Sequence, residues 1–391
     1  MRVLHTADWH LGRTLEGRSR IEEQAQFLSE LNEIVKEEDI DVILMAGDVF
    51  DTVNPPAAAE QLFYENMAQL TADRNCKIVL ISGNHDNPDR LSASAPIAGL
   101  HGITIIGYPK LEPIELQVDS CNQTLKIAAL PYPSEARLNE VLTESVEEEA
   151  LQSAYDQRIE AIFQQICKGF DETSVNLGMS HIYVAGGRES DSERPIQVGG
   201  AYTVSANALP SQVQYTALGH LHRPQTIQRA NSIARYSGSP LSYSFSEAGQ
   251  AKSVTILDVI PGEQPKINEV PLSSGKPLVR WKAEEGLAQI HRWLEEKKDT
   301  NAWIDLEIHL KDALSMEEIQ RLRNAHPGFI HIRPVFEEIQ ASNTNQRVSE
   351  LPIDQLFTRF YERQTNGGTP DDNTIKLFLE LIQHDEGSAV K

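Results

Sequence analysis

The chain has 391 residues, of which 40% are hydrophobic and 24% are charged, a composition that excludes a disordered or fibrous protein. No run approaches the ~20 apolar residues of a membrane span. The first residues lack the basic and apolar sections of a signal peptide, so we expect a cytoplasmic protein. Three widely spaced cysteines fit a reducing compartment and form neither a zinc-site spacing nor a disulfide framework.

The formal net charge of −22 argues against a protein that holds nucleic acid by itself. Such proteins present basic side chains to the phosphates. Bound divalent cations or a basic partner would add positive charge at the site where nucleic acid would bind. The charge therefore weakens the case for a nucleic-acid substrate without excluding it.

The first half of the chain alternates strand-like and helix-like segments. Apolar runs predict strands at Arg2–His5, Asp41–Ala46 and Lys77–Ser82. Helical spacing predicts a helix near Arg20–Glu38, and Pro55 and Pro56 open a second one that reaches about Leu70. This βαβαβ order predicts a mostly parallel sheet.

From about residue 103 the chain changes to short strands, interrupted by a predicted helix from about Glu144 to Lys168. Two sheets packed face to face, with helices outside, would bury both sets of apolar strands. We therefore predict an α/β fold, a two-sheet β-sandwich flanked by helices, over residues 1–270. The predicted strands are Ile103–Ile106, Leu125–Leu130, Val175–His181, Tyr215–Leu218 and Ser253–Val259.

Two smaller parts follow a loop at Pro271–Pro277. A strand–helix–strand–helix–strand pattern over residues 278–335 predicts a compact α+β domain. Residues 336–391 begin with a polar linker and continue with two amphipathic helical patterns that have no obvious core of their own. Their apolar positions are Ile353, Leu356, Phe357 and Phe360, and then Ile375, Phe378, Leu379 and Ile382.

Five short segments rich in metal-ligating side chains each follow a predicted strand. Strand ends at one edge of a sheet converge, so segments distant in sequence can form one site. Any one of them alone is more often a turn or a core histidine, but five in this order favour a shared metal site. They are Asp8-Trp9-His10, Gly47–Asp51, Gly83–Asp86, Ser180-His181 and Gly219–His222.

These segments supply two carboxylates, one carboxamide and four imidazoles, a donor set that suits Mn²⁺, Fe²⁺, Zn²⁺ or Mg²⁺. Seven ligands are too many for one ion, whereas two ions sharing a bridging carboxylate would each receive four. Such a centre hydrolyses phosphodiesters with a metal-held water, and His85 is placed to donate a proton or stabilise charge. The seven candidate ligands are Asp8, His10, Asp48, Asn84, His181, His220 and His222.

The pattern DxH, GDxxD, GNHD, H and GHxH resembles the calcineurin-like metallophosphoesterase superfamily, whose fold is a two-sheet sandwich flanked by helices. Within it, the chain is similar to the SbcCD-type double-strand-break nucleases. The segments that carry this resemblance lie within residues 1–245 and read VLHTADWHLGRTLEG, AGDVFDTVNPP, SGNHDNPDRL, and ALGHLHRPQ followed by RYSGSPLSYSFSE.

The resemblance implies a role for each site residue. Asp48 bridges two divalent ions, with Mn²⁺ expected and Mg²⁺ or another divalent ion as the alternative. His85 is catalytic. Asp51 stands where archaeal members often carry a second catalytic histidine, and we expect it to orient His85 or a water. One ion is held by Asp8, His10, Asp48 and His222, and the other by Asp48, Asn84, His181 and His220.

The resemblance also implies partners. The substrate is DNA, cleaved as an ATP-dependent 3′ to 5′ double-strand exonuclease and a single-strand or hairpin endonuclease in DNA repair and recombination. Residues 278–335 correspond to a capping domain, and residues 336–391 to the docking segment for an SbcC-type coiled-coil ATPase in a heterotetramer. A homodimer through the early helices is expected as well. Arg13 and the segment Arg235–Glu247 are expected along the DNA path, with Trp9 packed under the site.

Two alternative functions are compatible with parts of this sequence pattern. A phosphodiesterase or phosphatase for small nucleotides or phosphoproteins would use the same ligands and explain the acidic charge, but it would not need the α+β domain or the tail helices. A non-catalytic scaffold would be expected to have lost some ligands. This chain retains all seven, together with His85.

Overall fold

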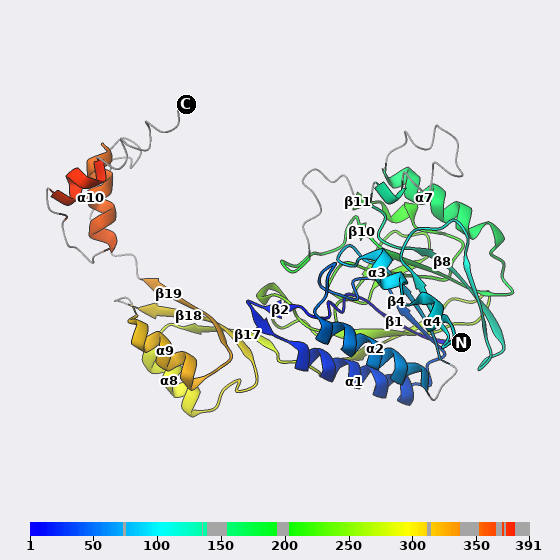
Figure 1. Ribbon diagram of the computed structural model, residues 1–391, viewed down its shortest axis with the longest axis horizontal. Coiled ribbons are helices and arrows are strands. Elements are labelled where there is room, and N and C mark those ends of the chain that lie inside the picture. The colour runs from blue at the N-terminus through cyan, green and yellow to red at the C-terminus, as the bar shows by residue number, and fades with distance from the viewer. Residues whose placement is uncertain are drawn as a thin grey trace. The chain divides into compact units, whose positions relative to one another are not determined.

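The computed structural model divides the chain into two compact units, Met1–Val335 and Phe336–Lys391. Figure 1 shows its ribbon. No helix in the described part is both long and apolar enough to cross a membrane. The described residues are 1–72, 76–134, 136–138, 155–193, 203–310, 314–336, 352–364, 370 and 373–379.

The first sheet has six strands in the order β16-β15-β1-β4-β5-β6. Strands β1, β4, β5 and β6 are parallel, which confirms the predicted βαβαβ beginning. Strands β15 and β16 extend the sheet in antiparallel fashion. Their bounds are β1 Arg2–Thr6, β4 Val42–Met45, β5 Lys77–Ile81, β6 Ile103–Ile106, β15 Ser253–Asp258 and β16 Lys266–Pro271.

The second sheet has the order β13-β14-β12-β9-β8-β7, with four parallel central strands and an antiparallel strand at each edge. Apolar side chains from both sheets form one buried layer, as predicted for two sheets packed face to face. The strands are β7 Ile114–Val118, β8 Gln123–Leu130, β9 Val175–His181, β12 Tyr215–Gly219, β13 Gln225–Ile227 and β14 Ile233–Tyr236.

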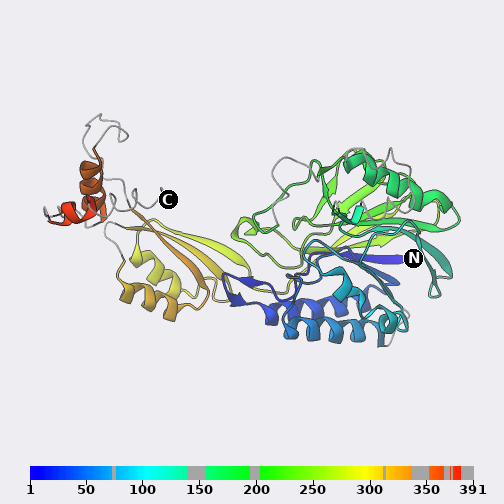
Figure 2. The ribbon, with the colours of Figure 1, turned by 45° about the horizontal axis from the view of Figure 1, so that its top comes forward.

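Helices cover the outer faces of both sheets. Helices α1 (Ile21–Glu37) and α2 (Ala57–Ala72) pack on the first sheet, and α7 (Tyr155–Ile166) packs on the second (Figures 1 and 2). Helix α1 forms because its apolar residues recur at helical spacing and acidic side chains occupy its first turn. The predicted helix from 144 to 168 is confirmed from 155 to 166, and residues 144–154 lie outside the described part.

Short elements complete the two-sheet part of the first unit. They are strands β2 Thr14–Leu15, β3 Arg18–Ser19, β10 Tyr183–Val184 and β11 Thr203–Val204, helices α3 Pro88–Ser92 and α4 Ala95–Gly99, and 3₁₀ turns η1 Cys167–Gly169, η2 Ala206–Ala208 and η3 Phe245–Glu247.

Strands β14 and β16 were not predicted from the sequence. Arg235 interrupts the apolar pattern of β14, yet it is buried, donates to Thr226 and Thr255, and forms an ion pair with Glu269 of β16. Strand β16 is an edge strand whose side chains are largely exposed, so it carries little apolar signal. A buried arginine and an exposed edge strand are features that a hydrophobic pattern misses.

The predicted strand–helix–strand–helix–strand pattern of the α+β module is confirmed. Its sheet has the order β17-β18-β19, and helices α8 and α9 pack on one face around Trp281, Ile304, Leu306 and Phe329. Ser315 and Glu318 form a reciprocal capping box at the start of α9. The bounds are β17 Leu278–Ala283, α8 Leu287–Glu295, β18 Trp303–Leu310, α9 Met316–Ala325 and β19 Phe329–Phe336.

A buried carboxylate, Glu23 of α1, joins this module to the sandwich. It accepts two hydrogen bonds from Arg20 at 3.0 and 2.6 Å, one from the Trp303 indole at 2.9 Å and one from the Lys276 backbone at 2.6 Å. Arg20 also donates to the Ser242 carbonyl. Burial opposes ionisation, but these donors hold the pKa of Glu23 below its usual value.

We expect Glu23→Ala to lower the free energy of unfolding by about 3 kcal/mol or more, because it leaves the buried Arg20 charge without its partner. Urea denaturation measures the change. Glu60→Ala is the matched control, since Glu60 also pairs with an arginine, Arg90, but at an exposed position where the loss should be much smaller. Equal losses for the two variants would contradict the role given to Glu23.

The second unit contains α10 (Ile353–Gln364) and a helical segment at residues 373–379. The rings of Phe357 and Phe378 stack with their centroids 3.9 Å apart. Ile353 and Phe360 are exposed. Both predicted amphipathic helices are thus present where the structure describes them, while Ile382 and the linker at 340–350 lie outside the described residues.

Candidate metal centre

All seven predicted ligands lie at or beyond the ends of parallel strands and form one cluster, in which Asn84 is partly exposed and the other six are buried. The first sheet supplies them after β1, β4 and β5, and the second sheet at the end of β9 and after β12. The site therefore spans the carboxyl edges of both sheets, as expected where parallel strands end together. Grouped by strand, the residues are Asp8 and His10, Asp48, Asn84, His181, and His220 and His222.

Asp48 lies at the middle of the cluster. Its Oδ2 atom is 3.4 Å from His181 Nε2, 3.7 Å from His10 Nε2 and 3.9 Å from His85 Nε2. Its Oδ1 atom accepts the backbone N–H of His85 at 2.8 Å. One carboxylate thus faces three imidazoles that come from three different strands.

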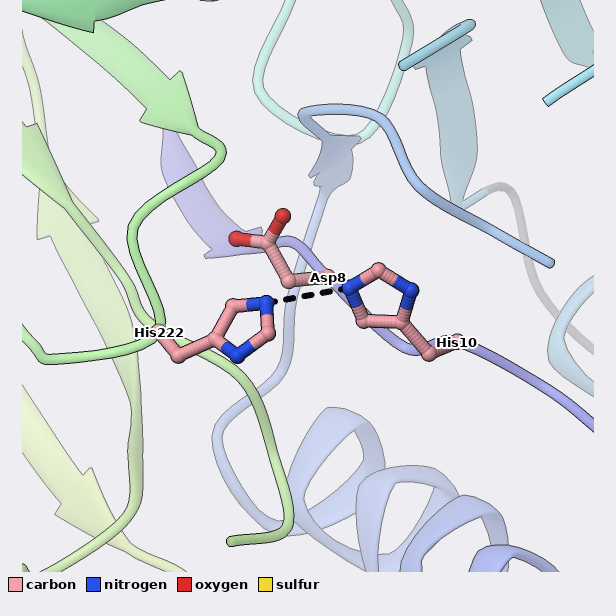
Figure 3. Close-up of side chains that lie close together, drawn as sticks. All are labelled: Asp8, His10 and His222. Atoms are coloured by element: carbon pink, nitrogen blue, oxygen red, sulfur yellow. Dashed lines mark hydrogen bonds between the residues drawn. The ribbon is translucent and has the colours of Figure 1, made fainter. Parts of the chain in front are cut away.

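Side chains gather in the same way on both sides of Asp48. On one side, His10 Nε2 and His222 Nε2 are 3.0 Å apart with the Asp8 carboxylate beside them (Figure 3). On the other side, Asn84 Oδ1 lies 2.8 Å from His181 Nε2 and 3.1 Å from His220 Nδ1. The structure thus brings the expected ligand residues together on both sides of Asp48, and their division into two ligand sets stays a prediction.

Glycines make room for this close packing. A Cβ on Gly47 would lie 2.4 Å from His181 Nδ1, one on Gly83 would lie 2.0 Å from Asp48 Oδ1, and one on Gly219 would lie 1.9 Å from the Ala46 carbonyl oxygen. Of these three, only Gly47 has a positive φ, at 92°. At Gly83 and Gly219 glycine is therefore required for space rather than for its backbone conformation.

The backbone strain falls on the ligands themselves. Among the described residues, ten non-glycine residues have positive φ, and four of them are Asp8, His10, Asp48 and His220. Non-glycine residues adopt this conformation at an energetic cost, and such residues concentrate at functional sites. The fold holds these four side chains in orientations that an unstrained loop would not give.

Burial and mutual charge set the protonation of the cluster. Burial lowers the pKa of His10 and His222, and lowers that of His220 to about 3, so these imidazoles are neutral. Although burial opposes it, the Asp48 and Asp8 carboxylates raise the pKa of His181 to about 9. Burial raises the pKa of Asp8, and the nearby Asp48 charge adds to the rise.

The donor set fits divalent cations. Asp8 and Asp48 are fully buried, and within the described part of the chain their ion-pair partners are histidines alone, with no lysine or arginine. Buried carboxylates normally pair with a full positive charge or bind a metal. Neutral imidazoles and carboxylate and amide oxygens are ligands for Mn²⁺ and similar ions.

His85 is oriented by the backbone of Asp51. Its Nδ1 lies 2.7 Å from the Asp51 carbonyl oxygen, so Nδ1 carries the proton and Nε2 faces Asp48. The Asp51 carboxylate is 3.9 Å from His85 Nδ1, 3.6 Å from His10 Nδ1 and 3.7 Å from Arg13 Nε, and it is partly exposed.

We therefore expect Asp51→Ala to reduce kcat by less than about tenfold. The backbone carbonyl that holds His85 is retained, and the carboxylate contacts that are lost contribute about as much free energy as one hydrogen bond. Steady-state hydrolysis of a small phosphodiester measures this. A loss as large as that of a His85 substitution would instead assign a catalytic role to the Asp51 carboxylate.

Several supporting residues were not predicted. Asp86 accepts the backbone N–H groups of Gly83, Val49 and Phe50, tying two ligand loops together, and burial raises its pKa to about 6. Ser192 lies 2.6 Å from His222 Nδ1 and donates to the buried Glu247. The sequence signal for Asp86 was its place in the GNHD motif, but nothing in the sequence marked Ser192.

The segment Arg235–Glu247 packs beneath the site, which corrects its expected place along the DNA path. Its residues are mostly buried, and the Tyr243 ring contacts His10 and His222 while its hydroxyl donates to the Trp9 carbonyl. Trp9 is buried under the site as predicted. Arg13 is partly exposed and donates to the Ser192 carbonyl at 2.7 Å.

Two known protein families match parts of this chain. The calcineurin-like phosphoesterase family matches residues 1–224, and a family described as the type 5 capsule protein repressor C-terminal domain matches residues 274–365. Two solved structures resemble the chain. TT1561 of Thermus thermophilus has a TM-score of 0.38 at 9% identity, and a dimetal phosphatase from Danio rerio has one of 0.42 at 11%. Each match covers 68% of this chain and 98% of the other.

The curated relatives are similar over most of the chain. The D subunit of the nuclease SbcCD from Bacillus subtilis is 60% identical over 381 residues, which is 97% of each chain. The protein of the same name from Rhodobacter capsulatus is 36% identical, covering 73% of this chain and 72% of its own. The one from Staphylococcus epidermidis is 28% identical, covering 99% of this chain and 100% of its own.

Proposed function

This chain belongs to the calcineurin-like phosphoesterases and, within them, to the SbcD family, and we propose that it is the Mn²⁺-dependent nuclease subunit of an SbcCD-type complex. It is a phosphodiester hydrolase. The observation that best supports the proposal is the central Asp48 carboxylate, which faces imidazoles from three strands at 3.4 to 3.9 Å.

Two divalent ions would occupy the two groups on either side of Asp48. When bound, they would supply Lewis-acid stabilisation of the phosphate and activate a water nucleophile. The residues proposed to hold them are Asp8, His10, Asp48 and His222 for one ion, and Asp48, Asn84, His181 and His220 for the other.

His85 is proposed to complete the chemistry as a proton donor or transition-state stabiliser. Its ring is fixed because Nδ1 donates to the Asp51 carbonyl and its backbone N–H donates to Asp48. To act as a proton donor, His85 would carry a second proton on Nε2 and give that proton up near the phosphate that the centre would hold. The proposed reaction needs no Ser or Cys nucleophile, since the attacking group would be a water molecule.

DNA is the proposed substrate, cleaved at duplex ends in a 3′ to 5′ direction and at single-stranded or hairpin positions. An SbcC-type coiled-coil ATPase would bind through residues 336–391 in a heterotetramer and couple cleavage to ATP. Its basic surface would also compensate for the charge of −22. Residues 1–270 then form the nuclease domain and residues 278–335 the capping domain, in a cytoplasmic enzyme for DNA repair and recombination.

The acidic charge favours one second candidate, a phosphodiesterase for small nucleotides. Both candidates would hydrolyse bis(p-nitrophenyl) phosphate, so the test uses a labelled DNA hairpin and a labelled linear duplex. Each is incubated with the chain, alone and with the matching ATPase and ATP, in Mn²⁺, Mg²⁺ or EDTA.

We expect hairpin cleavage in Mn²⁺, none in EDTA, and digestion of the duplex when the ATPase and ATP are present. Hydrolysis of the small phosphodiester with no DNA cleavage under any of these conditions would overturn the nuclease proposal in favour of the second candidate.

A further inference from the structure

We propose that Ser192, Glu247 and Lys252 form a hydrogen-bonded relay that fixes the imidazole of His222 in the tautomer with its lone pair on Nε2. The relay consists of positioning residues, since none of the three is proposed to contact a metal ion or the substrate. The inference rests on the proposed function in one respect, that His222 is a metal ligand.

The relay begins with a buried ion pair. Lys252 Nζ lies 2.5 Å from Glu247 Oε2, and both side chains are buried. Lys252 also donates to Ser239 Oγ at 3.0 Å and to the His222 carbonyl at 2.9 Å. Three acceptors for the three protons of one ammonium leave Lys252 fully hydrogen-bonded. A lysine so placed balances the negative charge of Glu247.

The carboxylate of Glu247 then dictates the direction of the next hydrogen bond. Its Oε1 atom accepts the backbone N–H groups of Tyr243 and Ser244, each at 3.0 Å, and lies 2.6 Å from Ser192 Oγ. An ionised carboxylate only accepts, so the Ser192 hydroxyl must donate to it. That donation uses the one proton of the Ser192 hydroxyl.

The tautomer of His222 follows from this direction. Ser192 Oγ lies 2.6 Å from His222 Nδ1, and because the serine proton points at Glu247, the imidazole must be the donor. Nδ1 therefore carries the hydrogen. In the neutral ring with its hydrogen on Nδ1, Nε2 is the nitrogen that carries the lone pair.

The lone pair on Nε2 faces the proposed metal position, beside Asp8 and 3.0 Å from His10 Nε2 (Figure 3). The other tautomer would place an N–H where a cation should bind. The His222 backbone is held as well, with its N–H donated to Glu193 at 2.8 Å and its carbonyl bound by Lys252. Partners on the second ring nitrogen commonly orient metal-binding histidines in this way.

The direct test is ¹⁵N NMR of the histidine rings in the metal-free wild-type chain, with the His222 signals assigned by comparison with His222→Ala. The proposal predicts a protonated Nδ1 and an unprotonated Nε2. A protonated Nε2 would overturn it. This measurement needs no variant of the relay and no bound metal, so it stands even if the metal or nuclease assignment fails.

A second test compares Ser192→Ala with Ser246→Ala by Mn²⁺ titration. Ser246 accepts the Asp191 backbone N–H at 2.9 Å, so it links the same two segments without touching His222. We expect Ser192→Ala to weaken one of the two Mn²⁺ sites by about 10- to 100-fold and to leave the other unchanged. Ser246→Ala should bind both ions as the wild type does.

Equal Mn²⁺ binding by Ser192→Ala and Ser246→Ala would overturn the relay. A wild-type chain that binds no Mn²⁺ would instead overturn the proposed function, while the tautomer measured by NMR would still decide whether the relay operates.

Discussion

Asp48→Asn is expected to reduce metal-dependent hydrolysis by at least about 10³-fold. The substitution keeps the size of the side chain and the oxygen that accepts the His85 backbone N–H, but it removes the charge that faces His181, His10 and His85. Loss of one charge-stabilising group in a buried site commonly costs two to three orders of magnitude, and a bridging carboxylate serves two ions.

The measurement is kcat with bis(p-nitrophenyl) phosphate and with a DNA hairpin in saturating Mn²⁺. Asp305→Asn is the matched control, because Asp305 is also a buried aspartate, but it lies in the α+β module, where it pairs with Arg333. It should change hydrolysis of the small substrate little. If Asp48→Asn kept wild-type kcat, Asp48 could not be the bridging ligand.

His85→Ala is expected to reduce kcat by about 10²- to 10⁴-fold while leaving the number of bound ions unchanged. Unlike Asp48→Asn, this substitution should not affect metal binding, because His85 is proposed to transfer a proton rather than to bind a cation. Its Nδ1 is committed to the Asp51 carbonyl, so the proton transfer falls to Nε2.

Mn²⁺ titration and kcat on the same His85→Ala preparation separate the two roles. Retained metal with reduced kcat supports the proton-donor role. Loss of an ion on substitution would make His85 a ligand, and an unchanged kcat would remove it from the mechanism.

The parallel strands and the ligand cluster could be predicted because each is marked by a pattern of neighbouring residues in the sequence. Each candidate ligand directly follows an apolar strand, and parallel strands bring their carboxyl ends to one edge whatever the length of chain between them. His181 is the last residue of β9 and His220 directly follows β12, and both lie within 3.1 Å of Asn84 Oδ1, which follows a strand of the first sheet. The place of each residue along its own strand was enough to predict that these residues gather, whereas their division into two ligand sets came from the family resemblance.

Several of the residues that support the ligands could not be predicted, because they are polar and lie far from the ligands in the sequence. Ser192 and Glu247 are ordinary polar residues 55 positions apart in the sequence, and only the fold places them behind His222. The segment that begins at Arg235 was expected along the DNA path, whereas Arg235 is buried in the sandwich and pairs with Glu269. Burial of a charge depends on a partner that the sequence does not reveal.

Counting the Mn²⁺ ions bound per chain, in equilibrium titrations of the wild type and Asp48→Asn, shows whether Asp48 bridges a two-ion centre. We expect two ions on the wild-type chain and a loss of tight binding at both positions in the variant. A single ion on the wild-type chain, or two ions whose affinity Asp48→Asn leaves unchanged, would contradict the bridging role of Asp48.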